Sequence, residues 1–332
     1  MKALVLFVLK LGLTAGFLWW AFSKVDLANP VFTKPGALDF RWLAAGIGCA
    51  GGALCLHALR WWCFLRGQRL DVSYGRAVEL IMIDGLFNLA SVSGLGGDAA
   101  RIVLLSRTHP GRKLAVAASV VADHIAGLVT ITLWFFLFSA ARFADLAAPS
   151  ALGEKVIHFA WFYFGGGLAL VILMFVCASP PVHALIHRND RFARWPVLKR
   201  MPEMCDVFRR RWKHSLAGLA CSVPMLATYS LAFYCGLRAI GAVTAPATVL
   251  TVMPVVDAIS GLPVSVAGIG VREKIFQVLA GDLGGVSAAD AVAASLAGFA
   301  CNAVWALGGA FFFLKKSDRV SRAEMQRTTA EL

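Results

Sequence analysis

The sequence carries little charge, and acidic residues are especially few. Only 15% of its 332 residues are charged, 59% are hydrophobic, and just 19 are Asp or Glu. A soluble domain has about 25% charged and about 45–50% apolar residues. This composition excludes an ordinary soluble enzyme, a disordered chain and a secreted disulfide scaffold, and it indicates a polytopic membrane protein.

The sequence also lacks the short motifs of cofactor and metal chemistry. None of its eight cysteines belongs to a C-x-x-C pair, and most lie in apolar runs, where a free thiol packs as a small hydrophobe. No Walker motif, nucleophile elbow or dinucleotide fingerprint occurs. His183 and His187 have metal-ligand spacing but no third ligand nearby. We therefore expect no cofactor and no metal.

What the sequence does contain is a set of long apolar runs. A membrane-spanning helix needs about 20 mostly apolar residues. Six segments meet this requirement: 3–22, 42–65, 113–140, 155–177, 214–238 and 289–314. The first resembles a signal peptide, but Trp19 and Trp20 beside the apparent cleavage site favour a retained helix. We expect residues 1–332 to form a single integral membrane domain.

Two further apolar segments are interrupted by polar residues and glycines. Segment 77–105 holds SVSGLG at residues 91–96, and segment 247–281 holds SVAGIG at residues 265–270. Four of the six positions are identical, an aspartate lies seven or eight residues before each motif, and charged residues follow each. The sequence therefore predicts two re-entrant segments, each built from a broken helix.

The basic residues indicate the orientation of the chain. If the N-terminus is cytoplasmic and the broken segments do not cross, 22 of the 32 Lys and Arg residues lie in inner stretches and five in outer ones. The positive-inside rule expects this bias. We predict two cytoplasmic termini, a basic cytoplasmic loop at 179–213 and a cytoplasmic tail at 315–332. The excess charge then faces anionic inner-leaflet lipids and is not a nucleic-acid footprint. Arg60 is expected to snorkel toward the inner interface.

The resulting topology has internal symmetry. The two halves, approximately 3–140 and 155–314, contain the same order of elements in opposite orientations. Broken helices at matching positions of two such halves are the best sequence indication of a transport site. The predicted fold is an all-α polytopic membrane protein, with six full transmembrane helices and two re-entrant segments in an inverted repeat.

The two breaks supply the candidate substrate-binding residues. A helix that begins after a Gly-x-Gly break offers free amides to phosphate, and arginine can bond two phosphate oxygens. We expect Asp98 to cap one such helix with Arg101 in its first turn, and Arg272 and Glu273 to lie in the first turn of the other. The alternative is that the glycines serve close helix packing and the charges pair structurally. The candidates are Asp84, Asn88, Ser91, Ser93, Gly94, Gly96, Gly97, Asp98, Arg101, Asp257, Ser260, Ser265, Gly268, Gly270, Arg272 and Glu273.

Acidic residues inside the apolar segments carry a separate expectation. Charges inside a membrane are costly and usually functional. Asp84 and Asp257 occupy corresponding places in the two halves, so we expect both to line one cavity. Asn302 could also hydrogen-bond a headgroup, or could join helices.

A third acid, Asp123, is followed directly by His124 within a long apolar segment. Histidine titrates near neutral pH, so this pair could couple protons or balance charge. Asp123 could instead pair structurally with Arg101 or Arg272. The sequence leaves the two alternatives open.

Both break motifs resemble those of a known family. Residues 94–101 (GLGGDAAR) resemble the G-x-x-GGD-x-x-R motif of the lysylphosphatidylglycerol synthase transmembrane, or flippase, domain family, and residues 268–273 (GIGVRE) resemble its G-x-G-x-R-E element. The resemblance covers about residues 5–315 and implies a helical lipid translocase. In bifunctional members this domain flips an aminoacylated phosphatidylglycerol made by an attached transferase.

The sequence departs from that family in two places. We find no transferase domain, and Asp123-His124 stands where the family often has an acidic residue followed by Arg. Stand-alone members are diverse, so the resemblance does not assign the lipid.

We therefore predict a translocase, and not an enzyme, in a bacterial-type cytoplasmic membrane. Its substrate would be a phospholipid or polyprenyl-phosphate-type lipid with an anionic headgroup. Two alternatives are a membrane-embedded lipid-modifying enzyme and a non-transporting partner of an envelope-lipid synthesis complex. Lipid identity, direction, driving force and association into a homo-oligomer stay open.

Overall fold

The computed structural model describes residues 2–23, 38–90, 96–144, 149–177, 211–262 and 264–314, together with Val25, Leu146 and Ser179. Every regular element within these ranges is a helix, as predicted. The basic loop at 179–213 and the tail at 315–332 fall almost wholly outside the described residues.

Five of the six predicted spans form helices that are long and apolar enough to cross a membrane. These are α3 (Phe40–Gly67), the continuous stretch Lys113–Ala144, α8 (Ala151–Cys177), α12 (Trp212–Ala239) and α15 (Ala288–Leu314). The second of these consists of α6 (Lys113–Trp134), the π-helical η2 (Phe135–Ser139) and α7 (Ala140–Ala144).

The first predicted span, 3–22, coincides with α1 (Lys2–Phe22), a helix of 21 residues. That length matches the hydrocarbon thickness of a bilayer at the α-helical rise. The sixth crossing itself stays a prediction.

Both interrupted segments form pairs of shorter helices. Segment 77–105 lies in α4 (Tyr74–Ala90) and α5 (Gly96–Thr108). Segment 247–281 lies in α13 (Pro246–Ser260) and α14 (Val271–Gly284), with the single 3₁₀ turn η3 (Val266–Gly268) between them. The second segment therefore breaks at its glycine motif, as the sequence predicts, whereas residues 91–95 of the first motif lie outside the described residues.

Glycine is required at position 270, directly before α14. Its φ of +85° lies in the left-handed region, which is favourable only for glycine. A Cβ at this position would also lie 2.6 Å from Phe17 Cβ and 2.7 Å from the Leu18 amide nitrogen. Gly270 thus permits both the turn and the close approach of α1.

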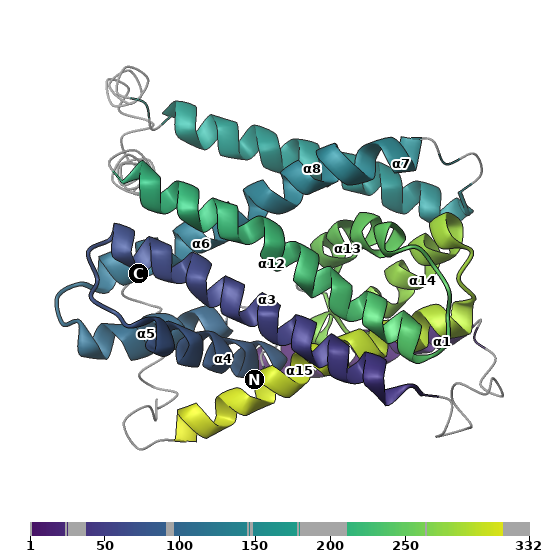
Figure 1. The fold of residues 1–332 in the computed structure, drawn as a ribbon, viewed down its shortest axis with the longest axis horizontal. Helices are drawn as coiled ribbons and strands as arrows, with labels where there is room; N and C mark the ends of the chain where they lie inside the picture. The colour runs from purple at the N-terminus through teal and green to yellow at the C-terminus, as the bar shows by residue number, and fades with distance from the viewer. Residues whose placement is uncertain are drawn as a thin grey trace.

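Figure 1 shows α3 and α12 side by side along most of their length, with α15 crossing them. The α4–α5 pair lies toward one end of this central group and the α13–α14 pair toward the other, while α8 runs along the periphery. The α4 helix also contacts η3, so the two interrupted segments meet inside the bundle.

Small residues allow the central helices to approach closely. A Cβ at Gly236 of α12 would lie 2.6 Å from the carbonyl oxygen of Ala294 in α15. A Cβ at Gly309 of α15 would overlap the carbonyl oxygen of Met82 in α4. Because lipid tails are as apolar as side chains, this van der Waals packing is a principal source of helix association.

We expect Gly309→Ala to destabilise the protein by about 1–3 kcal/mol, because a methyl group against the Met82 backbone forces α15 away from α4. The measurement is thermal unfolding of the purified protein in detergent. Gly52→Ala is the matched control, since no heavy atom lies within 4 Å of its added Cβ. Equal melting temperatures for the two variants would contradict the close α4–α15 contact.

Candidate functional site

Arg101 of α5 is 1% exposed and contacts three carboxylates. Its Nη2 lies 2.5 Å from Asp98 Oδ1, its Nη1 3.3 Å from Asp123 Oδ2, and its Nε 3.2 Å from Asp84 Oδ1. Its Cζ lies 4.9 Å from the centroid of the Trp61 ring. A buried guanidinium requires such neighbours, because an uncompensated charge in an apolar medium is very costly.

Asp123 of α6 extends these contacts to α3. It accepts a 2.7 Å hydrogen bond from Arg60 Nε, and its other oxygen lies 3.0 Å from His57 Nε2. Arg60 is only 5% exposed. The expectation that Arg60 snorkels is therefore wrong, because Asp123 holds its guanidinium in the interior. Of the pairings considered for Asp123, the one with Arg101 is present.

His124 contacts Asp98, with 2.8 Å between Nε2 and Oδ2. Asp98 is the third residue of α5, which begins at Gly96. The expectations that Asp98 caps this helix and that Arg101 lies in its first turn are therefore wrong. Asp98 lies inside the first turn, where its carboxylate bridges Arg101 and His124.

Seven residues form one ion-pair network: His57, Arg60, Asp84, Asp98, Arg101, Asp123 and His124. Arg60, Asp84, Arg101 and Asp123 are buried, whereas the His124 side chain is exposed. With both imidazoles neutral, the three carboxylates and two guanidiniums give a formal charge of −1. With both protonated, the formal charge of the network is +1.

Arg272 lies in the first turn of α14, as predicted, within a second buried cluster. Its Nε donates to Glu273 Oε1 at 3.2 Å, and its Cζ lies 4.0 Å from the centroid of the Phe299 ring. The fully buried Glu273 also accepts from the Gly270 amide at 2.5 Å and from Ser295 Oγ at 3.2 Å. Among the described residues, Arg272 Nη2 is buried without a hydrogen-bond partner.

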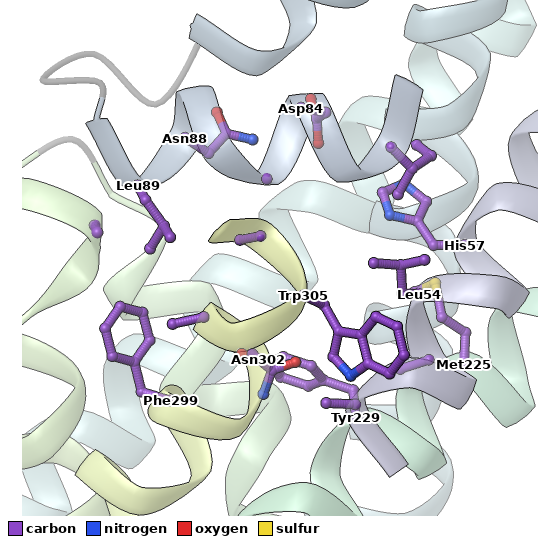
Figure 2. Close-up of a pocket in the computed structure, with 17 residues that line it drawn as sticks. Leu54, His57, Asp84, Asn88, Leu89, Met225, Tyr229, Phe299, Asn302 and Trp305 are labelled. Carbon is purple, nitrogen blue, oxygen red and sulfur yellow. The ribbon is translucent and has the colours of Figure 1, made fainter. Parts of the chain in front are cut away.

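A cavity of about 350 Å³ lies between α3, α4, α12, α15 and η3. Its polar lining consists of His57, Asp84, Asn88, Tyr229, Asn302 and Trp305. Figure 2 shows Asp84 and Asn88 on α4 along one side, with Asn302 and Trp305 of α15 across from them. The first interrupted segment thus forms one wall of this cavity.

A second cavity, of about 630 Å³, lies between α3, α6, α8, α12 and α13. Its polar and charged lining includes Arg60, Asp123, His124, Thr130, Tyr163, Ser222, Tyr229 and Asp257. Tyr229 and Met225 line both cavities. The Tyr229 hydroxyl donates to Asp257 Oδ1 at 3.1 Å. Asp84 and Asp257 therefore line different cavities, and the expectation that they share one is wrong.

The remaining candidates hold the backbone around the two breaks. The Gly97 amide donates to Asn88 Oδ1 at 3.2 Å, and a Cβ at Gly97 would overlap Asp84. A Cβ at Gly268 would lie 2.9 Å from the Ser260 carbonyl oxygen. These glycines serve close packing, which was the alternative interpretation. Within the described part, the Ser265 hydroxyl is buried without a hydrogen-bond partner. Ser91, Ser93 and Gly94 lie outside the described residues.

Sequence reasoning missed three contributors to this region. His57 and Arg60 lie one helical turn apart in an apolar segment, and that spacing was an available signal of a shared buried partner. Tyr229, which lines both cavities, gives no comparable signal, because tyrosine is common at membrane interfaces.

Long apolar helices that surround buried ion pairs and cavities with polar side chains in their walls define a polytopic membrane protein. The chain belongs to the family described as the lysylphosphatidylglycerol synthase TM region, whose sequence profile matches residues 7–308. This match confirms the resemblance carried by the two glycine motifs.

The chain is also similar to the UPF0104 membrane protein PH1989 of Pyrococcus horikoshii. The two are 26% identical over 140 residues, a stretch that covers 41% of this chain and 40% of that protein. The match thus spans about two fifths of the relative's length.

We expect Asp123→Asn to destabilise the protein by about 3–5 kcal/mol, because it leaves two buried guanidiniums short of a counter-charge. Thermal unfolding in detergent measures this loss. The matched control is Asp71→Asn, whose carboxylate is 95% exposed and 3.5 Å from Arg66 Nη1; it should melt like the wild type, since exposed pairs contribute little. A wild-type melting temperature for Asp123→Asn would contradict the network.

Proposed function

We propose that this protein moves a lipid with an anionic headgroup between the leaflets of a cytoplasmic membrane. The lipid is a phospholipid or a polyprenyl-phosphate-type lipid, and it leaves the protein chemically unchanged. In this proposal α1 is the sixth span, both termini are cytoplasmic, and the two interrupted segments re-enter from opposite faces as an inverted repeat. The charge bias of the loops and the matching positions of the breaks support this topology.

The observation that carries the proposal is the pair of cavities on either side of Tyr229 and Met225, each of which has polar and ionisable side chains in its wall. The first is bordered by α4 and η3, which belong to the two interrupted segments, and the second by α13. A headgroup that crosses an apolar bundle needs polar surroundings throughout, because an unpaired polar group in hydrocarbon costs several kcal/mol. In this proposal the polar and ionisable side chains in the walls of both cavities supply partners for the headgroup, while the lipid tails stay in the bilayer.

The two arginines play different parts in this proposal. Arg272 lies directly behind Phe299, which lines the first cavity, and its Nη2 has a free bonding position for a phosphate oxygen. Arg101 is enclosed by Asp84, Asp98 and Asp123, so a phosphate reaches it only by replacing a carboxylate. If a phosphate replaces a carboxylate, the positive charge of the Arg101 guanidinium stays neutralised throughout the exchange.

The ion-pair network supplies charge balance in this scheme. His57 faces the first cavity, His124 faces the second, and each contacts a carboxylate of the network. Protonation of both changes the formal charge of the network from −1 to +1, which favours entry of an anionic headgroup. In this proposal His124 exchanges the proton, and its charge acts on Asp123 electrostatically through Asp98 and Arg101, because His124 and Asp123 are not bonded to each other directly.

The test is transport of labelled phosphatidylglycerol between leaflets of liposomes that contain the purified protein. We expect transport by the wild type and a rate about tenfold lower for Tyr229→Phe, because the variant loses the hydrogen bond to the buried Asp257 carboxyl group and the hydroxyl shared by both cavity walls. Arg272→Ala should also slow transport. Mass spectrometry of the recovered lipid should find it unmodified.

The matched control is Tyr74→Phe, whose hydroxyl donates to the Cys55 carbonyl oxygen at 2.9 Å and lies in neither cavity. It should transport like the wild type. The proposal is wrong if the wild type moves neither phosphatidylglycerol nor a polyprenyl phosphate, or if Tyr229→Phe and Tyr74→Phe transport equally fast.

A further inference from the structure

A third cavity, of about 610 Å³, lies between α1, α8 and α14, and it shares no lining residue with the two central cavities. It is located where α1 ends and α8 begins. In the proposed orientation this is the external end of the bundle. The proposed path of the headgroup does not pass through this third cavity.

Two lysines line this cavity. Lys274 of α14 is only 4% exposed; its Nζ donates to Gln277 Oε1 at 2.8 Å and lies 5.1 Å from the centroid of the Trp20 ring. Lys155 lies in the second turn of α8 and is exposed. The two lysines thus line the same cavity from two different helices.

The acidic residue of this lining is already hydrogen-bonded. Asp282 Oδ2 accepts from the Ser150 amide at 3.1 Å and from Ser150 Oγ at 2.9 Å, which attaches the start of α8 to α14. Two ammonium groups against one carboxylate leave the lining with a net positive charge. The first residues of α8, which also line the cavity, add the positive end of a helix dipole.

The position of this cavity relates it to the membrane surface. Trp20 lies near the C-terminal end of α1 and lines the cavity. Tryptophan is enriched in membrane proteins at the level of the lipid headgroups. On α14, Arg272 contacts Phe299 of the interior, whereas Lys274, two residues later, contacts Trp20. The helix therefore places one cation against Phe299, which lines the first cavity, and another in the lining of this third one.

We propose that the third cavity binds the phosphate of an anionic lipid headgroup at the external end of the bundle. Lys274 and Lys155 hold the phosphate oxygens through charge-assisted hydrogen bonds, and Trp20 packs beside the glycerol or isoprenoid portion of the lipid. The site deepens the proposed translocase function, because it gives the headgroup a docking position outside the path. Its occupancy, however, does not require transport.

The experiment counts phosphatidylglycerol molecules bound to the full-length protein in detergent by native mass spectrometry, with zwitterionic phosphatidylcholine for comparison. We expect Lys274→Gln and Lys155→Gln each to weaken phosphatidylglycerol binding about tenfold, because each removes one charge-assisted hydrogen bond. Lys155→Arg, which keeps the charge, should bind like the wild type. Lys155 is exposed, so its variants test the site even if Lys274→Gln folds poorly.

The control is Arg41→Gln, because Arg41 is an exposed cation at the start of α3 and lines none of the three cavities. It should keep wild-type affinity for phosphatidylglycerol. Equal affinities for Lys155→Gln, Lys274→Gln and Arg41→Gln would overturn the proposal. Displacement of the lipid by inorganic phosphate of equal affinity would assign the cavity to free phosphate and overturn the lipid site.

The transport assay separates this site from the proposed function. A wild-type protein that binds phosphatidylglycerol through these two lysines but moves no lipid supports the site and contradicts the translocase. A protein that moves lipid but binds it equally well without either lysine supports the translocase and overturns the site.

Discussion

A guanidinium with 1% of its surface exposed, inside a bundle of apolar helices, has to be neutralised by the protein itself. Arg101 meets this condition through Asp84, Asp98 and Asp123, which belong to α4, α5 and α6. The relative positions of three helices therefore depend on one side chain, and Arg60 adds a fourth helix through Asp123. Apolar residues in such a place often give equal or greater stability. Buried ionisable residues are therefore not explained by stability alone, and they are typical of functional regions in membrane proteins.

The two halves share a backbone design but not a chemistry. In the first, the arginine follows the second glycine of the motif by five residues and reaches the carboxylates of neighbouring helices. In the second, Arg272 follows Gly270 by two residues and bonds the adjacent Glu273, which also accepts the Gly270 amide. Arg101 therefore joins its helix to two others by ion pairs, whereas Arg272 pairs within its own turn and contacts α15 through the Phe299 ring.

The long helices were predictable because a lipid environment restricts composition over their whole length. Segment 42–65 corresponds to Phe40–Gly67, and segment 289–314 to Ala288–Leu314. The breaks were predictable because glycine supplies backbone conformations and close approaches that other residues resist, as at Gly270.

The partners of the buried charges were harder to predict. Hydropathy locates a helix along the chain but does not give its rotation about its own axis. That rotation decides that Arg60 faces Asp123 and that His124 faces Asp98. For the same reason, the corresponding positions of Asp84 and Asp257 in the two halves predicted a single shared cavity. In the structure the two aspartates line different cavities. Charged residues inside a membrane protein can be recognised as important from the sequence. Which of them pair depends on which helix faces meet in the fold.

Tyr229 forms part of the wall of both central cavities, and this geometry makes the two volumes interdependent. A ligand that displaces the Tyr229 ring when it fills one cavity changes the space in the other and the hydrogen bond to Asp257. By thermodynamic linkage, occupation of the second cavity then alters affinity in the first by the same factor. The walls that the two cavities have in common, Tyr229 and Met225, are therefore where a change of shape in one is transmitted to the other.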